Sequence, residues 1–335
     1  MPPEEPVRVT RSVIAGDSLA RLVTSAYDLP APIRRALVQV GDNDNYRVTA
    51  GSARYIARLY RYGKYWLAGE FAYRFELDWL LYLHERGLPV SSPIQRRDGD
   101  HLGRIQTPEG VRYWALFSVA PGATVHEMTD EQARLFGATV AQIHRASNAF
   151  RSPHTRLTIG VEHLLDDALA RILSYLGETR PADRAFLTDL TARLRATLLV
   201  LPYLADEWGI IGGDFHGSNA HFAASGTLTH FDFDLCGYGW RAYDVAVFLW
   251  NMRRRNAPTR LRAAYLAGYQ AVRPLTPAEA GALSAFVQTR QIWQMGYHTT
   301  LYGDRGDYWL DDAYWDQRIG WSRAWASEDG AQPLS

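Results

Sequence analysis

The hydrophobic pattern of the chain changes near residue 120, and this change constrains the fold more than any other feature. Between residues 36 and 119, short apolar runs are separated by turns rich in glycine, asparagine and aspartate, with one stretch of helical period among them. Beyond residue 123 most periodic segments repeat every 3.6 residues, as helices do. We therefore expect an α+β protein with a sheet in its N-terminal part and a mainly helical C-terminal part.

The N-terminal part is predicted to fold as β-β-β-α-β-β, after an opening helix from Asp17 to Tyr27. The turn between the first two strands is expected to extend from Gly41 to Asn45, because glycine, asparagine and aspartate tolerate positive φ angles. Gly87 is expected to end the helix of the sheet region. The predicted strands cover residues 37–40, 46–49, 55–61, 101–106 and 111–119, and the predicted helix covers residues 67–86.

A short linker is expected to divide the chain into two lobes. We place the N-terminal lobe at residues 1–119, the linker at 120–123 and the C-terminal lobe at 124–335. Strands and turns at residues 208–235 interrupt the helices of the C-terminal lobe. The helices themselves are predicted at residues 130–147, 161–176, 181–201, 242–254, 259–271 and 277–302, followed by a tryptophan-rich tail.

The charge balance and the cysteine count exclude several classes of protein. Lysine plus arginine and aspartate plus glutamate number 36 each in 335 residues, which gives no argument for nucleic acid or an anionic membrane as a partner. Cys236 is the only cysteine, so no intrachain disulfide can form, as is usual in a reducing cytoplasm. The N-terminus lacks a signal-peptide pattern, and no apolar run is long enough to cross a bilayer. We expect a cytoplasmic monomer or homodimer.

The stretch most informative about chemistry begins at Ile210. An apolar strand end leads into a loop of small residues that contains Asp214, with Asn219 five residues later and Asp232 thirteen residues after that. Phosphoryl transfer needs an acceptor for the proton of the nucleophile, hard oxygen ligands for Mg²⁺ and cations on the phosphates. Carboxylate and amide oxygens are ligands that Mg²⁺ accepts. These three side chains would supply the proton acceptor and the metal ligands.

Two of these motifs resemble a known superfamily. Gly-Asp-Phe-His-Gly-Ser-Asn is similar to the His-Gly-Asp-x-His-x-x-Asn catalytic loop of aminoglycoside phosphotransferases, choline kinases and type II homoserine kinases, with a glycine in place of the first histidine. Phe-Asp-Phe-Asp resembles their metal-binding motif, the counterpart of Asp-Phe-Gly in protein kinases. The resemblance implies a protein-kinase-like bilobal fold with ATP between the lobes. It also implies that Asp214 is the catalytic base and that Asn219 and Asp232 bind Mg²⁺.

The resemblance extends over about residues 36–255. It implies that Arg58 holds the phosphates in place of the usual lysine, that Glu76 pairs with it, and that Asp244 steadies the catalytic loop. The segment from Leu116 to Gly122, with Ser118 and Ala120 in it, resembles the segment that contacts adenine through its backbone. Asn43 and Asn45 fall in the turn that would cover the phosphates, where backbone N–H groups and amide side chains can meet anions.

Several of these residues also have a structural interpretation. His216 either orients the loop, approaches the substrate or is a structural histidine, and Asp234 is either a second metal ligand or a turn residue. Asp244 can be explained as a helix N-cap, and Arg58 as a charge on the solvent face of a strand. Lys64, the single lysine of the chain, is the alternative phosphate ligand, and Glu70 is the alternative partner on the helix.

The sequence does not specify which molecule accepts the phosphoryl group. Asp304, Asp307 and Arg290 are candidates for substrate contact, because helices of this region line the acceptor pocket in the superfamily. We expect an ATP- and Mg²⁺-dependent kinase for a hydroxyl of a small molecule: an aminoglycoside, another antibiotic or natural product, a sugar or an amino alcohol such as homoserine. The alternatives are a nucleotide-binding pseudokinase that acts as an interaction module, and a homoserine-kinase-like or stress-response protein kinase.

Overall fold

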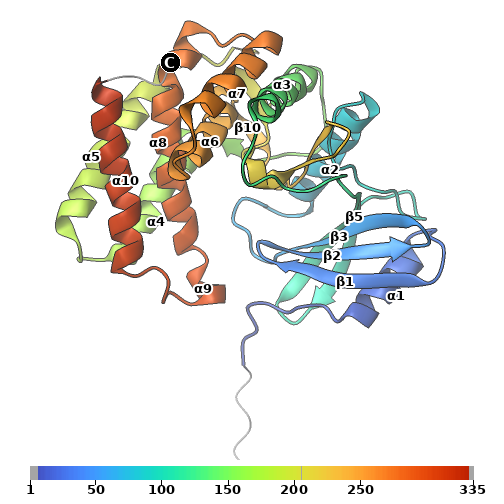
Figure 1. Cartoon of the computed structure of the whole chain (residues 1–335). Coiled ribbons are helices and arrows are strands. Elements are labelled where there is room, and N and C mark those ends of the chain that lie inside the picture. Colours follow the sequence, from blue (N-terminus) through green and yellow to red (C-terminus); the bar gives the residue numbers. More distant parts are fainter. Residues whose placement is uncertain (1–6, 205, 332–335) are drawn as a thin grey trace, which may run out of the picture. The chain divides into compact units, whose positions relative to one another are not determined.

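The computed structural model describes residues 7–204 and 206–331, and the contacts between residues divide the chain into two compact units (Figure 1). Unit 1 comprises the chain up to Pro121 together with Ser152–Thr155. Unit 2 comprises Gly122–Arg151 and the chain from Arg156 onward. Unit 1 contains the five-stranded sheet and unit 2 most of the helices, so the expected α+β fold class is confirmed.

The sheet of unit 1 is antiparallel throughout, with the strand order β1-β2-β3-β5-β4. Helix α1 packs its buried Leu19 and Val23 against the sheet residues Tyr46, Val48 and Leu59, which are all fully buried. The elements are α1 (Gly16–Ala26), β1 (Ile33–Val40), β2 (Asn43–Ala50), β3 (Ala53–Tyr60), α2 (Glu70–Glu85), β4 (Gly103–Thr107) and β5 (Gly110–Ser118).

The turn between β1 and β2 is shorter than predicted. Strand β2 begins at Asn43, so only Gly41 and Asp42 lie between the strands. The Asn43 side chain is buried and its Oδ1 accepts a hydrogen bond of 2.6 Å from Nζ of Lys64. Asn45 donates from Nδ2 to the side chain of Gln39 at 3.0 Å. Cross-strand pairing and these side-chain bonds therefore extend the strand into residues whose composition predicted a turn.

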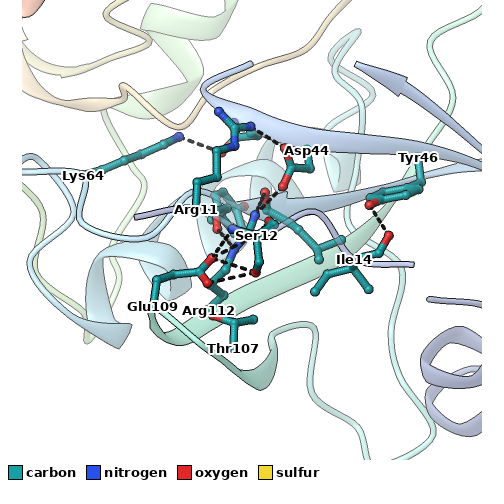
Figure 2. Close-up of polar contacts among 12 residues, drawn as sticks. Arg11, Ser12, Ile14, Asp44, Tyr46, Lys64, Thr107, Glu109 and Arg112 are labelled. Carbon is teal, nitrogen blue, oxygen red and sulfur yellow. Dashed lines mark hydrogen bonds and ion pairs between the residues drawn. The ribbon is translucent and has the colours of Figure 1, made fainter. Parts of the chain in front are cut away.

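A buried ion cluster ties the N-terminal segment of the described chain to the sheet (Figure 2). The Asp44 carboxylate, with no exposed surface, pairs with Arg11 and accepts from Nη2 of Arg112 at 2.7 Å. Arg112 also donates from Nη1 to the Ser12 carbonyl at 2.7 Å, and Glu109 accepts from the Ser12 hydroxyl at 2.8 Å. Buried charges are tolerated when they are paired and hydrogen-bonded, and each of these is.

Unit 2 is built around helix α8 (Pro277–Thr299), which contacts α4, α5, α6 and α10. Helices α5 and α10 can be followed beside it in Figure 1. The predicted helix at 161–176 begins instead with a π-helical turn (Glu162–Asp166), and the one at 277–302 ends at Thr299. The other helices are α3 (Asp130–Ser147), α4 (Asp167–Leu176), α5 (Pro181–Leu199), α6 (Arg241–Arg254), α7 (Thr259–Val272), α9 (Tyr302–Arg305) and α10 (Asp312–Ala331).

Two glycines let α3 and α7 cross at close range. A Cβ on Gly137 of α3 would lie 2.1 Å from the Tyr265 carbonyl oxygen, and one on Gly268 of α7 would lie 2.0 Å from that of Arg134. Such contacts require the absence of a side chain, so the backbones pack directly against each other. The crossing fixes α3, whose C-terminal half contributes to the site described below.

Short strands complete unit 2. Strand β10 (Gly237–Trp240) lies between β6 (Thr158–Ile159) and β7 (Trp208–Ile211), and β8 (Ala220–Phe222) forms a hairpin with β9 (Leu228–His230). Among the described residues, no helix is long and apolar enough to cross a membrane.

The ion cluster of unit 1 gives a test of stability. We expect Asp44→Asn to lower the free energy of unfolding by about 3 kcal/mol, because Arg11 and Arg112 would keep buried charges without their anion. Chemical denaturation of the full chain measures the change. Asp17→Asn, which removes an exposed ion pair with Arg21 on α1, is the matched control and should leave the midpoint unchanged. Equal midpoints for both variants would contradict this role for Asp44.

Candidate active site

One loop and one hairpin bring the three predicted residues of unit 2 together. Strand β7 leads into Asp214, and a single turn of 3₁₀ helix (Gly217–Asn219) follows. The β8–β9 hairpin pairs Ala220 with His230, and at its base the Phe231 N–H donates to the Asn219 carbonyl at 3.0 Å. Asp232 therefore directly follows Phe231, whose backbone is bonded to that of Asn219, although Asp232 and Asn219 are thirteen positions apart in the sequence.

The Asp214 carboxylate is surrounded by donors. Nδ2 of Asn219 donates to its Oδ2 at 3.0 Å, and Nη2 of Arg290 pairs with its Oδ1. Arg290 is 3% exposed and also donates from Nη1 to the Gly213 carbonyl at 3.1 Å. Burial raises the pKa of Asp214, but its electrostatic interactions with His216 and Arg290 and the hydrogen bonds from His216 and Asn219 outweigh it and hold that pKa well below its ordinary value. The side chain is an anion and is 16% exposed.

His216 lies in the same loop, within contact of the carboxylate. Its Nε2 is 3.4 Å from Oδ2 of Asp214, and its Nδ1 accepts from the Ser218 N–H at 3.2 Å. The second bond anchors the ring to the turn that follows Asp214. Of the interpretations open from the sequence, orientation of the loop is the one that these contacts favour.

The residues expected to hold Mg²⁺ offer suitable oxygens. Because Nδ2 of Asn219 donates to Asp214, its Oδ1 faces away from that carboxylate. Asp232 has a φ of +68°, a left-handed conformation that is strained for a residue with a side chain and that recurs at functional sites. One amide oxygen and one carboxylate match what Mg²⁺ takes from a protein. No group of three His, Cys, Asp or Glu side chains within the described residues could hold a metal ion.

Asp234 and Cys236, close behind in the chain, are held through their backbones. Both are buried, and Arg156 donates to the carbonyl of Asp234 and, from Nε at 2.6 Å, to that of Cys236.

A second carboxylate, that of Asp244, holds the start of the loop. Its Oδ2 accepts from the Gly212 N–H and its Oδ1 from the Gly213 N–H, both at 2.8 Å. Nε2 of His144 on α3 lies 2.9 Å from Oδ2. Burial raises the pKa of Asp244 to about 7, and the two backbone donors oppose that rise. The N-cap interpretation is wrong, because α6 begins at Arg241 and Asp244 bonds to the loop rather than to its own helix.

Glycine begins the loop motif because the neighbouring ring leaves no room for a side chain. A Cβ on Gly212 would lie 2.5 Å from Cε2 of Phe215. Phe215 is buried and packs edge-on against His230 and Phe233, with ring centres 5.1 and 5.6 Å apart. Gly213 needs a φ of +75°, where a Cβ would lie 2.5 Å from the Leu235 carbonyl oxygen.

In unit 1, Arg58 and Glu76 form a buried ion pair. Nη1 of Arg58 on β3 lies 3.3 Å from Oε1 of Glu76 on α2, and the guanidinium carbon lies 5.1 Å from the centre of the Phe117 ring. Arg58 is 6% exposed, so the interpretation as a charge on a solvent face is wrong. The rival Lys64 is bonded to Asn43, and the competing Glu70 pairs with Arg74 at 2.6 Å.

The backbone of Ser118, one of the residues predicted to contact adenine, is already hydrogen-bonded within unit 1. The Ser118 N–H donates to the Ser92 carbonyl at 2.9 Å, and the Ser118 carbonyl accepts from the Ser91 hydroxyl. A nucleotide base could therefore bond to the Ser118 N–H only by replacing its bond to the Ser92 carbonyl. Ala120, two residues further on, is buried.

Of the predicted substrate residues whose side chains the structure describes, Arg290 lies at the loop and Asp307 does not. Asp307 is exposed between α9 and α10, and the side chain of Asp304 lies outside the described residues. The sequence did not reveal that Arg290 would pair with Asp214, or that His144 would support Asp244. Their partners are 76 and 100 positions away, and no local pattern marks such contacts.

The site and the fold together define a class, the protein-kinase-like phosphotransferases. A model of the family described as "phosphotransferase enzyme family" matches residues 35–282. The chain belongs to this family. An uncharacterized protein of Deinococcus radiodurans is 35% identical over 96% of this chain and 92% of its own length. A homoserine kinase of Phenylobacterium zucineum is 29% identical over 81% of this chain and 80% of its own length.

Solved structures share the fold. A microcompartment-associated aminopropanol kinase superposes with a TM-score of 0.79 and 24% identity, covering 95% of this chain and 100% of that one. The amicoumacin kinase hAmiN, solved with AMP-PNP, Ca²⁺ and Ami, gives a TM-score of 0.73 and 20% identity, covering 91% of this chain and 93% of that one. Together with the family model over residues 35–282, these matches confirm the expected superfamily.

Buried histidines of unit 2 make stability depend on pH. Burial lowers the pKa of His163 to about 4 and those of His230 and His298 to about 3, whereas an unfolded histidine titrates near its ordinary value. The folded chain therefore binds fewer protons, and we expect the unfolding temperature to fall as the pH drops from about 6.5 towards 4. Each histidine contributes up to about 1.4 kcal/mol per pH unit.

Asp244 acts in the opposite direction, because its raised pKa favours the protonated form in the folded chain as the pH falls through about 7. One such group does not offset three histidines. Calorimetry between pH 7 and pH 5 measures the net effect, and a flat or rising profile would contradict the prediction.

Proposed function

We propose that the protein is an ATP-dependent kinase that transfers the γ-phosphoryl group to a hydroxyl of a small molecule, with Asp214 as the catalytic base. The observation that supports this most is the anionic, partly exposed Asp214 carboxylate, held by Asn219 and Arg290. The family to which the chain belongs transfers phosphoryl groups, and a kinase of the same fold was solved with AMP-PNP and Ca²⁺.

Each residue of unit 2 has a role that follows from its contacts. Asp214 accepts a hydrogen bond from the acceptor hydroxyl, orients it towards the phosphorus and takes its proton as the bond forms. Its lowered pKa keeps it ionised for this purpose. Asn219 fixes one carboxylate oxygen through Nδ2 and leaves its Oδ1 for a metal. Arg290 fixes the other oxygen, so the carboxylate cannot rotate away from the hydroxyl.

Each unit, taken by itself, contains residues with a proposed role toward the nucleotide or its metal. Mg²⁺, with Asn219 and Asp232 as its protein ligands, would neutralise charge on the phosphates. Arg58 is proposed to bind the phosphates, and its ion pair with Glu76 holds the guanidinium in a defined position. His216, which lies against Asp214, is proposed to position the loop.

Removing the proposed base tests the assignment. Asp214→Ala should lower kcat by about 10²–10⁴-fold, because the hydroxyl loses both its proton acceptor and its orientation. Binding of Mg-ATP, measured by titration calorimetry, should be largely retained. Turnover is followed by ATP consumption with mass-spectrometric detection of the phosphorylated acceptor. If Asp214→Ala retained the wild-type kcat, the assignment would fail, and if the wild type consumed no ATP with any acceptor while binding it, the pseudokinase alternative would be favoured.

Removing a proposed metal ligand should change the magnesium requirement. We expect Asp232→Asn to raise the Mg²⁺ concentration needed for half-maximal turnover by about tenfold or more, because an amide oxygen carries no charge for the cation. Chelation should abolish turnover of the wild type. Asp311→Asn, at an exposed aspartate before α10, is the control. Identical Mg²⁺ titrations for Asp232→Asn and the wild type would remove Asp232 from the site.

A further inference from the structure

Three arginines from three different helices gather next to the Asp214 loop. The guanidinium carbons of Arg254 on α6 and Arg290 on α8 each lie 5.2 Å from the centre of the Trp250 ring. Trp250 donates from Nε1 to Oε1 of Gln291 at 2.8 Å, and Nε2 of Gln291 donates to the carbonyl of Arg318 on α10 at 3.3 Å. Arg254, Arg290 and Arg318 are hereafter the arginine cluster.

Two of the three arginines have no compensating anion among the described residues. Asp214 compensates Arg290, but Arg254 and Arg318 have no ion pair among the residues that the structure describes. The Nε atoms of all three are buried and have no hydrogen-bond partner in the same part of the chain. Burying an N–H donor of a charged group without a hydrogen bond costs free energy. The arrangement therefore favours a bound acceptor that the described residues do not supply.

Nearby carboxylates are engaged elsewhere. Glu328 and Asp329 at the end of α10 pair with Arg253, at 2.6 and 2.9 Å. Asp312 and Asp316 at its beginning pair with Arg180. These acidic residues of α10 therefore pair with other arginines and do not neutralise the positive charges of Arg254 and Arg318.

Two further groups respond to that field. Burial, and after it the charges of Arg318, Arg255 and Arg290, lower the pKa of Arg254. Burial, and after it the charges of Arg318, Arg290, Arg305 and Arg254, lower the pKa of His298 to about 3, so His298 is neutral. Its Nδ1 lies 2.7 Å from the Tyr314 hydroxyl, and the Tyr314 ring centre is 5.4 Å from the guanidinium carbon of Arg318. Like charges held together in this way favour an anion between them.

We propose that Arg254 and Arg318, beside Arg290, bind an anionic group of the acceptor, a carboxylate or a phosphate, while its hydroxyl lies at Asp214. The proposal rests on the kinase function proposed above and names its substrate class. Guanidinium groups bind both anions through paired N–H donors, and the aromatic rings under them hold those donors in place. A polycationic aminoglycoside would meet like charge at this position.

The acidic segment between α9 and α10 does not alter this conclusion. Asp307 and Asp311 are exposed, and Asp311 accepts from the Tyr314 N–H at 2.9 Å, as a helix cap does. Asp312 is 88% exposed and paired with Arg180. These carboxylates face solvent, whereas the arginine cluster is partly or fully buried next to the proposed base.

Anion binding can be measured without knowing the acceptor. The full chain is titrated with malonate and, separately, with inorganic phosphate, in the presence of Mg²⁺ and saturating AMP-PNP so that any nucleotide phosphate site is filled. We expect at least one anion to bind the wild type, and the Arg254→Met/Arg318→Met double variant to bind it about tenfold more weakly or worse. Arg323→Met, which removes an exposed cation of the same helix paired with Asp183, should bind like the wild type.

The outcome also separates the two anions. Binding of malonate alone points to a carboxylate acceptor, and binding of phosphate alone to a phosphate ester. The proposal is overturned if the wild type binds neither anion, or if the double variant and the wild type bind with equal affinity. Thermal unfolding of the double variant provides the folding control, and we expect no loss of stability because the substitutions remove like charges that repel.

A turnover experiment links the cluster to the reaction. The acceptors are matched sets, 4-hydroxybutyrate, 1,4-butanediol and 4-amino-1-butanol, together with glycerol 3-phosphate and glycerol. We expect the anionic member of a set to have the highest kcat/KM, and the double variant to lose that preference through KM. Preferred turnover of the ammonium member would overturn the anion proposal and leave the kinase assignment intact, whereas no ATP consumption by the wild type with any acceptor would overturn the kinase assignment alone.

Discussion

The carboxylate of Asp244 accepts the N–H groups of Gly212 and Gly213, and the geometry of the candidate active site depends on this contact. It is buried, and it binds three groups from two other elements, since His144 on α3 completes its shell. Helix α3 is in turn fixed by the glycine crossing with α7. The position of Asp214 is thus determined by packing that extends through much of unit 2, and not by the loop alone.

Arg290 connects that loop to the electrostatics of the acceptor side. One of its nitrogens pairs with Asp214, and its guanidinium lies over the rings of Trp250 and Trp293. The guanidinium of Arg254 also lies over the Trp250 ring. The cation therefore keeps the proposed base ionised and belongs to the positive cluster that we assign to the acceptor. Because one side chain serves both purposes, the charge of the acceptor and the state of the base are coupled through Arg290.

Local patterns predicted most of the helices and strands and singled out the motif residues. Alternation and turn residues predicted the five strands, and the spacing of Asp214, Asn219 and Asp232 predicted a cluster that the β8–β9 hairpin then assembles. Patterns failed where pairing or packing decided the outcome. Composition predicted a turn for residues that pair in β2. The position of Asp244 suggested a helix cap, although the side chain bonds to the Asp214 loop and to His144 on α3.

The arginine cluster and the ion cluster around Asp44 could not be found in the sequence. Arg112 and Asp44 are 68 positions apart, and Arg290 and Asp214 are 76 apart. Contacts at such separations form only when the helices and strands pack together. The sequence around a helical arginine is the same whether its side chain forms an ion pair, stacks on a ring or binds a ligand.

Lys64 gives the chain an unusual property as an experimental object. It is the single lysine of the sequence, and its ammonium group is buried against Asn43, close to the rings of Tyr60 and Trp66. Amine-directed reagents and lysine acetylation thus have one ε-amino group to modify, beside the first turn of the sheet. Its rate of modification reports the opening of that corner of unit 1 directly, with no background from other side chains.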